Sequence, residues 1–287
     1  MLNYDRLYLA YFRLMILKPN FINAYTKEGH YMPVIFGEFK QDRKQTGLNL
    51  QVISGIPSPW TEAVKGILYI KHLPYIAIKH DPFNEEQNKW FGSNTAPALK
   101  ANASPGLINW LDILNYLETQ SPTPTLFPLD NHDKEIHLSL CHDICSKLGL
   151  GWNRRLQSVH QGLSGNGGFP LKIAHYLAVK YEYFESAATL YDDEVNRILT
   201  RLKTHLFAQR AIGSPYYIQY QLTALDIYSA VFMAYFKPLE NAICPMYPSI
   251  RTAFESYNDD VARALDPILF EHRDFIYQEH LELPLSL

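Results

Sequence analysis

Short apolar runs and one helical face follow each other in the region of residues 48–80. Residues 50–54 and 75–79 are strand-like runs, and residues 61–73 between them place apolar side chains at helical spacing. Two strands joined by one helix predict a βαβ unit with parallel strands and a right-handed crossover. This unit begins a predicted α/β domain over residues 48–120.

The rest of that domain is predicted from turn signals and a second helical stripe. Residues 83–91 indicate a short polar helix, and residues 95–100 indicate a strand that turns back at Ser104-Pro105-Gly106. A helix is expected over residues 107–118, where leucine and isoleucine recur at helical spacing. The predicted order is therefore βαβ, a β-hairpin and a closing helix.

Residues 1–47 precede this domain and are predicted to be an extension. Apolar residues recur at helical spacing over residues 7–17, and Pro19 ends that amphipathic helix. Residues 31–39 are expected to be an extended piece that lies along the α/β domain.

A linker rich in proline and threonine, residues 121–130, separates the α/β domain from a predicted all-helical domain. The glycine-rich segment 162–168 has neither the Lys-Ser/Thr of a P-loop nor a preceding strand, so it is interpreted as a flexible connection. Within residues 131–287, helices are predicted near residues 132–147, 171–183, 187–209, 223–236, 248–257 and 260–280, the last with an interruption at Asp266-Pro267.

Thr223 and Asp226 mark the start of the most apolar helix. A Thr followed three residues later by an Asp is a capping box, in which each side chain accepts a hydrogen bond from the other residue's backbone N–H. Leu222 and Ile227 have the spacing of a hydrophobic staple. Because no charged residue follows Asp226 up to Phe236, this helix is expected in the middle of the helical domain.

Four features, in this order along the chain, resemble the glutathione transferase family. They are Ser58-Pro59-Trp60, where the family holds Cys or Ser followed by Pro; Ala96-Pro97, where it carries a cis-proline; residues 110–117, which resemble its Ser-x-Ala-Ile-x-x-Tyr-Leu helix; and the box from Thr223 to Asp226. The resemblance covers about residues 48–280. It implies a thioredoxin-like α/β domain, an all-helical domain and a homodimer.

In this resemblance, the α/β domain holds glutathione. Ala96 would offer its backbone N–H and C=O to the cysteinyl part of the ligand beside a cis Pro97, for which an ordinary trans proline is the alternative. Ser58, at a helix N-terminus, would hydrogen-bond the bound thiolate and lower the pKa of the thiol. Ser54 is the lesser candidate for that role, and Trp60 is a further expected binding residue.

Ser58 also has a purely structural interpretation. A serine at the N-cap with a proline at the first helical position is a common combination, and the two roles are compatible. Because a serine cannot form a mixed disulfide, thiol-transfer chemistry through Ser58 is not expected.

Asn109 and Trp110 depart from the family pattern. They stand where the family has a Glu/Gln-Ser pair, whose Ser and helix N-terminus bind the γ-glutamyl carboxylate. The indole is expected to occupy the place of that carboxylate, and Asp112 would repel it while being able to bind the ligand's amino group. Glutathione is therefore predicted to bind weakly, with a dissociation constant in about the millimolar range.

The helical domain carries two further sets of residues that are considered as binding sites. His137, Cys141 and Cys145 recur every four residues on one helix, a span too long for one tetrahedral ion, so buried cysteines are preferred over a metal site. Four aromatic or histidine residues are interpreted either as the lining of an apolar substrate pocket or as core: Tyr176, Tyr181, Tyr183 and His175.

Composition and charge argue against several classes of protein. The net charge is −3, and no run of Lys and Arg is longer than the one near residues 40–44. The sequence therefore has no cluster of basic residues that would bind nucleic acid or an anionic membrane. Three cysteines do not form a secreted disulfide framework, which favours a cytoplasmic location. Residues 7–17 are too short to span a bilayer.

The leading hypothesis is an enzyme that activates the thiol of glutathione, or of a similar thiol, for attack on an electrophile held by the helical domain. Glutathione is then a co-substrate, and no metal is expected. The alternative is a non-catalytic binding or interaction protein of the same fold that has lost the carboxylate site at Asn109-Trp110. Both hypotheses rest on the resemblance of the fold more than on a complete site.

Overall fold

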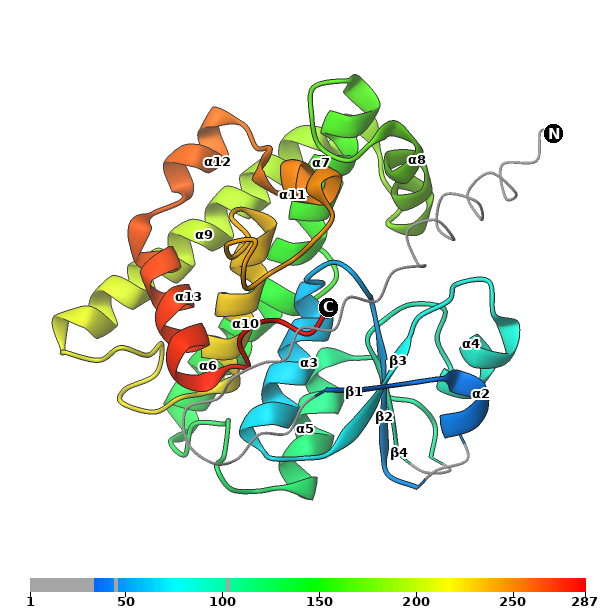
Figure 1. Ribbon diagram of the computed structural model, residues 1–287. Helices are drawn as coiled ribbons and strands as arrows, with labels where there is room; N and C mark the ends of the chain where they lie inside the picture. The colour runs from blue at the N-terminus through cyan, green and yellow to red at the C-terminus, as the bar shows by residue number, and fades with distance from the viewer. Residues whose placement is uncertain (1–33, 44–45, 102–103) are drawn as a thin grey trace. The chain divides into compact units, whose positions relative to one another are not determined.

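The structure is a computed structural model, and it describes residues 34–43, 46–101 and 104–287. An α/β domain comes first and a helical domain follows it (Figure 1). The helix predicted over residues 7–17 lies outside the described residues.

A mixed four-stranded sheet in the order β1-β3-β2-β4 forms the centre of the α/β domain. β2 is parallel to β3, with Leu50 opposite Ala77, and antiparallel to β4, with Leu50 opposite Leu99. The predicted βαβ unit is confirmed. The strands are β1 Ile35–Gly37, β2 Leu48–Val52, β3 Tyr75–Lys79 and β4 Ala98–Ala101.

The strand β1 comes from the segment predicted to precede the α/β domain. Its three residues pair in parallel with β3, Ile35 opposite Ile76, and add an edge strand to the sheet. The expectation of an extended piece along the domain is thus confirmed for β1. The next residue but one begins the short helix α2, Phe39–Asp42.

The predicted hairpin after β4 is reduced to a single bridge. Leu99 and Leu107 exchange both backbone hydrogen bonds, at 2.8 and 2.7 Å. Within the described residues no further strand follows this bridge before the helix α5 begins at Trp110.

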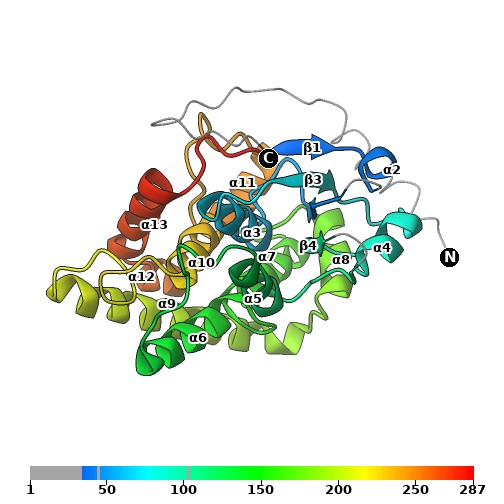
Figure 2. The ribbon, with the colours of Figure 1, turned by 90° about the horizontal axis from the view of Figure 1, so that it is seen from below.

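Helices cover both faces of the sheet (Figure 2). Leu50 and Val52 belong to the main core, together with residues of α3 and α5, whereas Ile78 and Ala98 lie in a second cluster with residues of α2 and α4. Because side chains alternate along a strand, the two clusters lie on opposite faces. The helices of this domain are α2, α3 Pro59–Ile70, α4 Glu85–Phe91 and α5 Trp110–Gln120.

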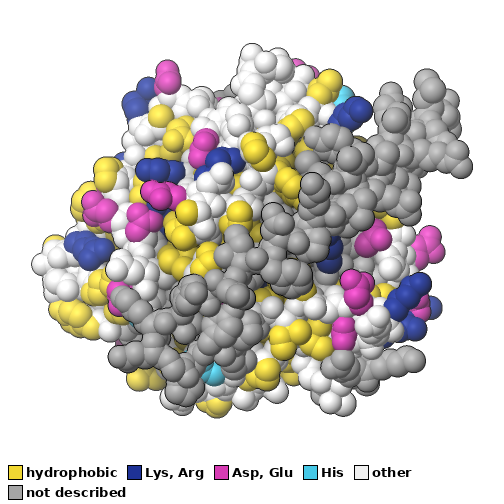
Figure 3. Space-filling model, in the orientation of Figure 1, with side chains coloured by type: hydrophobic (Ala, Val, Ile, Leu, Met, Phe, Trp, Pro, Cys, Tyr) yellow, Lys and Arg dark blue, Asp and Glu magenta, His cyan; other side chains and the backbone are white. Residues whose placement is uncertain are grey.

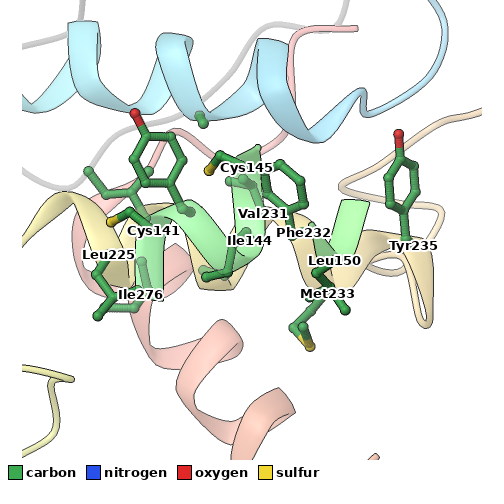
Figure 4. Close-up of a cluster of buried hydrophobic side chains, with 14 of the residues drawn as sticks. Cys141, Ile144, Cys145, Leu150, Leu225, Val231, Phe232, Met233, Tyr235 and Ile276 are labelled. Carbon is green, nitrogen blue, oxygen red and sulfur yellow. The ribbon is translucent and has the colours of Figure 1, made fainter. Parts of the chain in front are cut away.

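The helical domain packs around α10, which continues as a 3-10 turn, η2. All residues of both are buried, and α10 contacts α3, α6 and α13, so it also joins the two domains. Figure 4 shows Cys145 of α6 and Phe232 of α10 in one apolar cluster. The elements are α6 Asn131–Cys145, α7 Leu150–Ser164, α8 Leu171–Lys180, η1 Glu185–Ala187, α9 Ala188–Ala211, α10 Ala224–Phe232, η2 Met233–Tyr235, α11 Pro248–Glu255, α12 Asp259–Ala264 and α13 Pro267–His280.

The apolar pattern does not predict α7. Its buried residues include Asn153, Arg154, Gln157 and Ser158, so polar side chains interrupt the apolar stripe that identifies a helix. Arg154 nevertheless has acceptors for its charge, because it donates to the Tyr235 carbonyl and to the carbonyls at the end of α11.

The capping box at the start of α10 is confirmed, and it is larger than predicted. The Asp226 carboxylate accepts hydrogen bonds from the Thr223 and Tyr217 amides, both at 2.8 Å, and lies 3.0 Å from His272 Nε2 of α13. Each of these four side chains is 0 % exposed. The box therefore ties α10 to the preceding loop and to α13.

The linker between the domains is held by one buried cation. Lys71 Nζ lies 2.7 Å from Glu118 Oε1 and also donates to two linker carbonyls, including that of Pro124. Further along the linker, the Leu126 carbonyl accepts from the Ala224 amide at 2.9 Å. These bonds connect α3, α5 and the start of α10.

Candidate functional site

Most of the residues predicted to bind a ligand gather at one edge of the sheet. Gln51 near the end of β2 pairs with Ala98 at the start of β4, so the loop after β2 and the turn before β4 lie side by side. The helix α5 begins three residues after Leu107, which is paired with Leu99 of β4. The fold thus brings residues near 54–60, 96–97 and 109–110 to the same edge.

Ser58 occupies the N-cap position of α3, with Pro59 at the first helical position. Its side chain is 4 % exposed, and its hydroxyl makes no capping hydrogen bond to the first turn of the helix. The position predicted for Ser58 is confirmed, but its side chain does not cap α3. Ser54 lies two residues after the end of β2 and is half-buried.

The turn before β4 has the predicted backbone. The Ala96-Pro97 bond is cis. The neighbouring Thr95 carbonyl accepts from Gln51 Nε2 and from Ser93 Oγ, both at 2.9 Å, which fixes the turn to the end of β2. In the part of the chain that is described, the Ala96 amide donates no hydrogen bond.

Asn109 and Trp110 start α5 in different ways. Asn109 is exposed, and its Oδ1 accepts from the Leu111 amide at 2.9 Å as an N-cap. The Trp110 ring packs edge-to-face against Tyr228 of α10, with centroids 5.7 Å apart. Trp110 is therefore part of the contact between the two domains.

Trp60 joins the same domain contact. Its indole N–H donates to the Cys145 carbonyl at 2.9 Å, and its ring packs edge-to-face against Phe232 at 5.0 Å. Its only polar atom is thus bonded to the helical domain, and only its ring remains for the ligand contact predicted from the sequence.

Two cations beside Tyr181 were not identified from the sequence. The Arg155 guanidinium lies 5.0 Å from the Trp60 ring and donates to the hydroxyls of Tyr181 and Tyr235. Lys180, the last residue of α8, lies 5.9 Å from the same Tyr181 ring. No described carboxylate lies within 4.0 Å of either cation.

His80 follows β3 directly and lies near Lys180. It is 6 % exposed, its amide donates to the Val52 carbonyl at 2.9 Å, and neither ring nitrogen has a hydrogen-bond partner within 3.5 Å among described residues. Burial, followed by the nearby Lys180 charge, lowers the pKa of His80 to about 4; Asp81 and the Asn94 backbone offset part of this shift. A histidine directly after a parallel strand was a usable signal, because ligands bind outside the carboxyl ends of such strands.

The aromatic and histidine residues interpreted from the sequence as pocket lining or as core do not form one cluster. Tyr181 is buried, and its ring lies 4.7 Å from that of Trp152. The Tyr183 hydroxyl is 2.8 Å from His160 Nδ1, and His175 is exposed. Tyr181 contacts both Arg155 and Lys180, and the Tyr176 ring lies 6.0 Å from Lys180.

His137, Cys141 and Cys145 lie on the buried face of α6. The distance from Cys141 Sγ to His137 Nε2 is 3.7 Å, and burial raises the pKa of both thiols. Among described residues no group of three potential ligands is placed to hold a metal ion. These residues pack as core side chains, as the interpretation of buried cysteines expects.

Acid pH is expected to destabilise the protein partly through His137. Burial lowers the pKa of this imidazole from 6.5 to about 4, so between these values the unfolded chain binds a proton that the folded chain does not. The free energy of unfolding should fall as the pH falls through this window, by up to about 3 kcal/mol from this residue. Denaturant titrations of wild type and His137→Leu at several pH values measure how steeply the free energy of unfolding changes with pH, and this change should be smaller in the variant. An equal change in both proteins would show that folding does not lower the pKa of His137.

The face of the protein in Figure 3 is mixed in charge where its residues are described. On the face in Figure 3, acidic and basic side chains are interspersed, with no field of one sign. The mixed charge of this face agrees with the net charge of −3 and with the lack of a long basic run in the sequence. No helix in the described ranges combines the length and the apolar character needed to cross a membrane.

No protein-family model and no curated protein matches the chain, but solved structures resemble it. Ure2p in complex with S-p-nitrobenzylglutathione has a TM-score of 0.53 at 16% identity, covering 84% of this chain and 94% of that one. A glutathione S-transferase from Methylobacterium radiotolerans, in complex with glutathione sulfonate, has a TM-score of 0.51 at 18% identity, covering 84% and 97%. One from Methylobacillus flagellatus, with glutathione bound, has a TM-score of 0.50 at 14% identity, covering 81% and 95%. This chain has the two-domain fold of the glutathione transferases, with a thioredoxin-like α/β domain before an all-helical domain.

Proposed function

We propose that this protein binds glutathione, or a similar thiol, at the edge of the sheet that holds Ser58, and activates the thiol for attack on an electrophile. The observation that carries this proposal is the Ser58 hydroxyl, which lies at the start of α3 and is not used as a helix cap. The Ala96 amide lies at the same edge and has no hydrogen-bond partner among described residues. Structures of the same fold hold glutathione or a derivative of it.

The chemistry follows from the N-terminus of α3. The first backbone N–H groups of a helix have no intrahelical partner and carry partial positive charge, so they favour a thiolate over a thiol. The Ser58 hydroxyl donates to that thiolate, and the thiol proton leaves to solvent. The sulfur then forms a bond to the electrophilic carbon, and the bond to the leaving group breaks. Ser58 itself forms no covalent bond.

A second candidate is a binding protein of the same fold without catalysis. The observation that favours it is Trp110, which takes the place of the family's carboxylate-binding serine and packs against Tyr228 of the helical domain. A ligand carboxylate at the start of α5 then loses a charge-assisted hydrogen bond, worth about 1.5 to 3 kcal/mol.

Glutathione titration distinguishes the two candidates. We expect native protein to bind glutathione with a dissociation constant in about the millimolar range, and the double variant Asn109→Glu with Trp110→Ser to bind about ten- to a hundredfold more tightly. Isothermal calorimetry on both proteins measures this. Because the serine leaves space next to Tyr228, the melting temperature is measured in parallel, and Trp110→Phe serves as the control that keeps an aromatic ring but adds no hydroxyl.

Each outcome of that titration favours one candidate. Weak native binding that improves in the double variant, together with turnover of an aryl halide, supports the thiol-activating enzyme. Absence of binding by both folded proteins would instead favour the non-catalytic protein, because the restored contact would then have failed to rebuild a site.

Two other properties stay predictions. A homodimer is implied by the resemblance of the sequence to the family. A cytoplasmic location is proposed from cysteine usage, and the three cysteines are buried free thiols, which fits a reducing compartment.

A further inference from the structure

Two cations and one histidine from separate elements gather near the edge of the sheet that holds Ser58. Arg155 comes from α7, Lys180 from the end of α8, and His80 from the end of β3. We propose that these three residues form a binding site for an oxyanion group, such as a carboxylate, on the molecule that the helical domain holds. This inference rests on the proposed function in one respect, since it names the charge class of the electrophile.

The lack of anionic partners for these cations is the first argument. Lysine and arginine in protein interiors are normally paired, and this chain follows that rule elsewhere. Lys65 is buried beside Glu62, at 2.9 Å, and Arg154, the neighbour of Arg155, donates to three backbone carbonyls. Arg155 and Lys180 are half-buried, yet no described carboxylate or carbonyl accepts from either of them. A ligand oxyanion would supply the missing charge.

The geometry of Arg155 is the second argument, because it is held in place before any ligand binds. Three aromatic rings surround its guanidinium, with centroids at 4.6 Å for Tyr181, 5.0 Å for Trp60 and 5.3 Å for Tyr235. The hydroxyls of the two tyrosines accept one N–H group each, and a guanidinium has five. The remaining donors can bind a planar oxyanion without further ordering of the side chain.

His80 and Lys180 complete the site. Neither His80 ring nitrogen has a hydrogen-bond partner within 3.5 Å among the residues described here, although the side chain is more than nine-tenths buried, so an oxyanion can compete with the Asn94 backbone for an imidazole N–H. The charged groups near His80 are Lys180 and Asp81, and the one near Lys180 is Arg155. Burial and the Arg155 charge lower the pKa of Lys180 to about 8, and a bound anion would raise it again.

A pair of probes without a thiol tests the proposal on the full chain. Calorimetric titrations compare 4-nitrobenzoate with 4-nitrobenzamide, which has a similar shape but no charge. We expect the carboxylate to bind at least about tenfold more tightly than the amide. Lys180→Met should remove most of that preference and leave amide binding unchanged. Lys172→Met, an exposed lysine on the same helix α8, is the matched control and should keep the preference.

The pH dependence provides a second measurement. As the pH rises from 7 to 9, Lys180 loses its proton with a pKa of about 8, so the preference for the carboxylate should decline. Titrations in buffers of different ionisation enthalpy should show proton uptake on binding at pH 8, and this uptake should be lost in Lys180→Met.

Several outcomes would overturn the inference. They are equal affinity for the two probes, binding of neither, and an unchanged preference in Lys180→Met with a wild-type melting temperature. Arg155→Met is not the main test, since its loss also removes the bonds to Tyr181 and Tyr235. Glutathione titration is run separately. A protein that prefers the carboxylate but does not bind glutathione contradicts the proposed function alone. A protein that binds glutathione but shows no preference for the carboxylate contradicts this inference alone.

Discussion

Replacing Asp226 by alanine is expected to lower the free energy of unfolding by about 3 to 5 kcal/mol. The substitution leaves the Thr223 and Tyr217 amides without an acceptor and removes the partner of His272 Nε2, all in a fully buried region. It touches no residue proposed to bind a ligand. Urea denaturation followed by circular dichroism measures the loss.

Two variants make the Asp226 result specific. Asp226→Asn keeps one oxygen acceptor and should lose a smaller part of the stability, since the Tyr217 amide can still be satisfied. Asp260→Ala removes an exposed carboxylate from the first turn of α12, and its effect should stay within about 0.5 kcal/mol. An Asp226→Ala protein that unfolds at the wild-type urea concentration would show that the buried network does not stabilise the helical domain.

Replacing Ser58 by alanine is expected to lower turnover of a model electrophile by roughly ten- to a thousandfold, with much less change in thiol affinity. The hydroxyl bond strengthens as negative charge develops on the sulfur, so its loss affects the rate more than binding. Because the hydroxyl does not cap α3, the melting temperature should stay close to that of wild type. Steady-state kinetics with glutathione and an aryl halide, repeated over a range of pH, measure both the rate and the pKa of the bound thiol.

Ser54→Ala is the matched control for Ser58. Ser54 lies in the same loop after β2 but not at a helix N-terminus, so this variant should keep the wild-type rate and the wild-type pKa of the bound thiol. If Ser54→Ala loses activity and Ser58→Ala keeps it, the activating hydroxyl is Ser54. If both keep the wild-type rate, neither serine activates the thiol.

Signals within a few residues of one another were enough to predict much of the fold. The strands β2 and β3, the helix between them and the capping box at Asp226 depend on side-chain periodicity or on hydrogen bonds three residues apart, and all are confirmed. The cis bond at Pro97 and the start of α3 at Ser58 follow from motifs that match a known family. Such features are readable from sequence because the interactions that form them are local.

The sequence by itself therefore determined the order of the elements from β2 to α5 and the start of α10. The place where a thiol would bind stays a prediction from the same motifs. Tertiary structure alone decided that β1 pairs with β3, that Trp60 donates to the helical domain, and that Lys180 lies near both Tyr181 and His80. The physical reason is distance along the chain. His80 and Lys180 are a hundred residues apart, and α7, which carries Arg155, buries polar side chains that hide its helical period. Packing between distant parts of the chain brings such residues together, and a sequence pattern over a few residues does not predict these contacts.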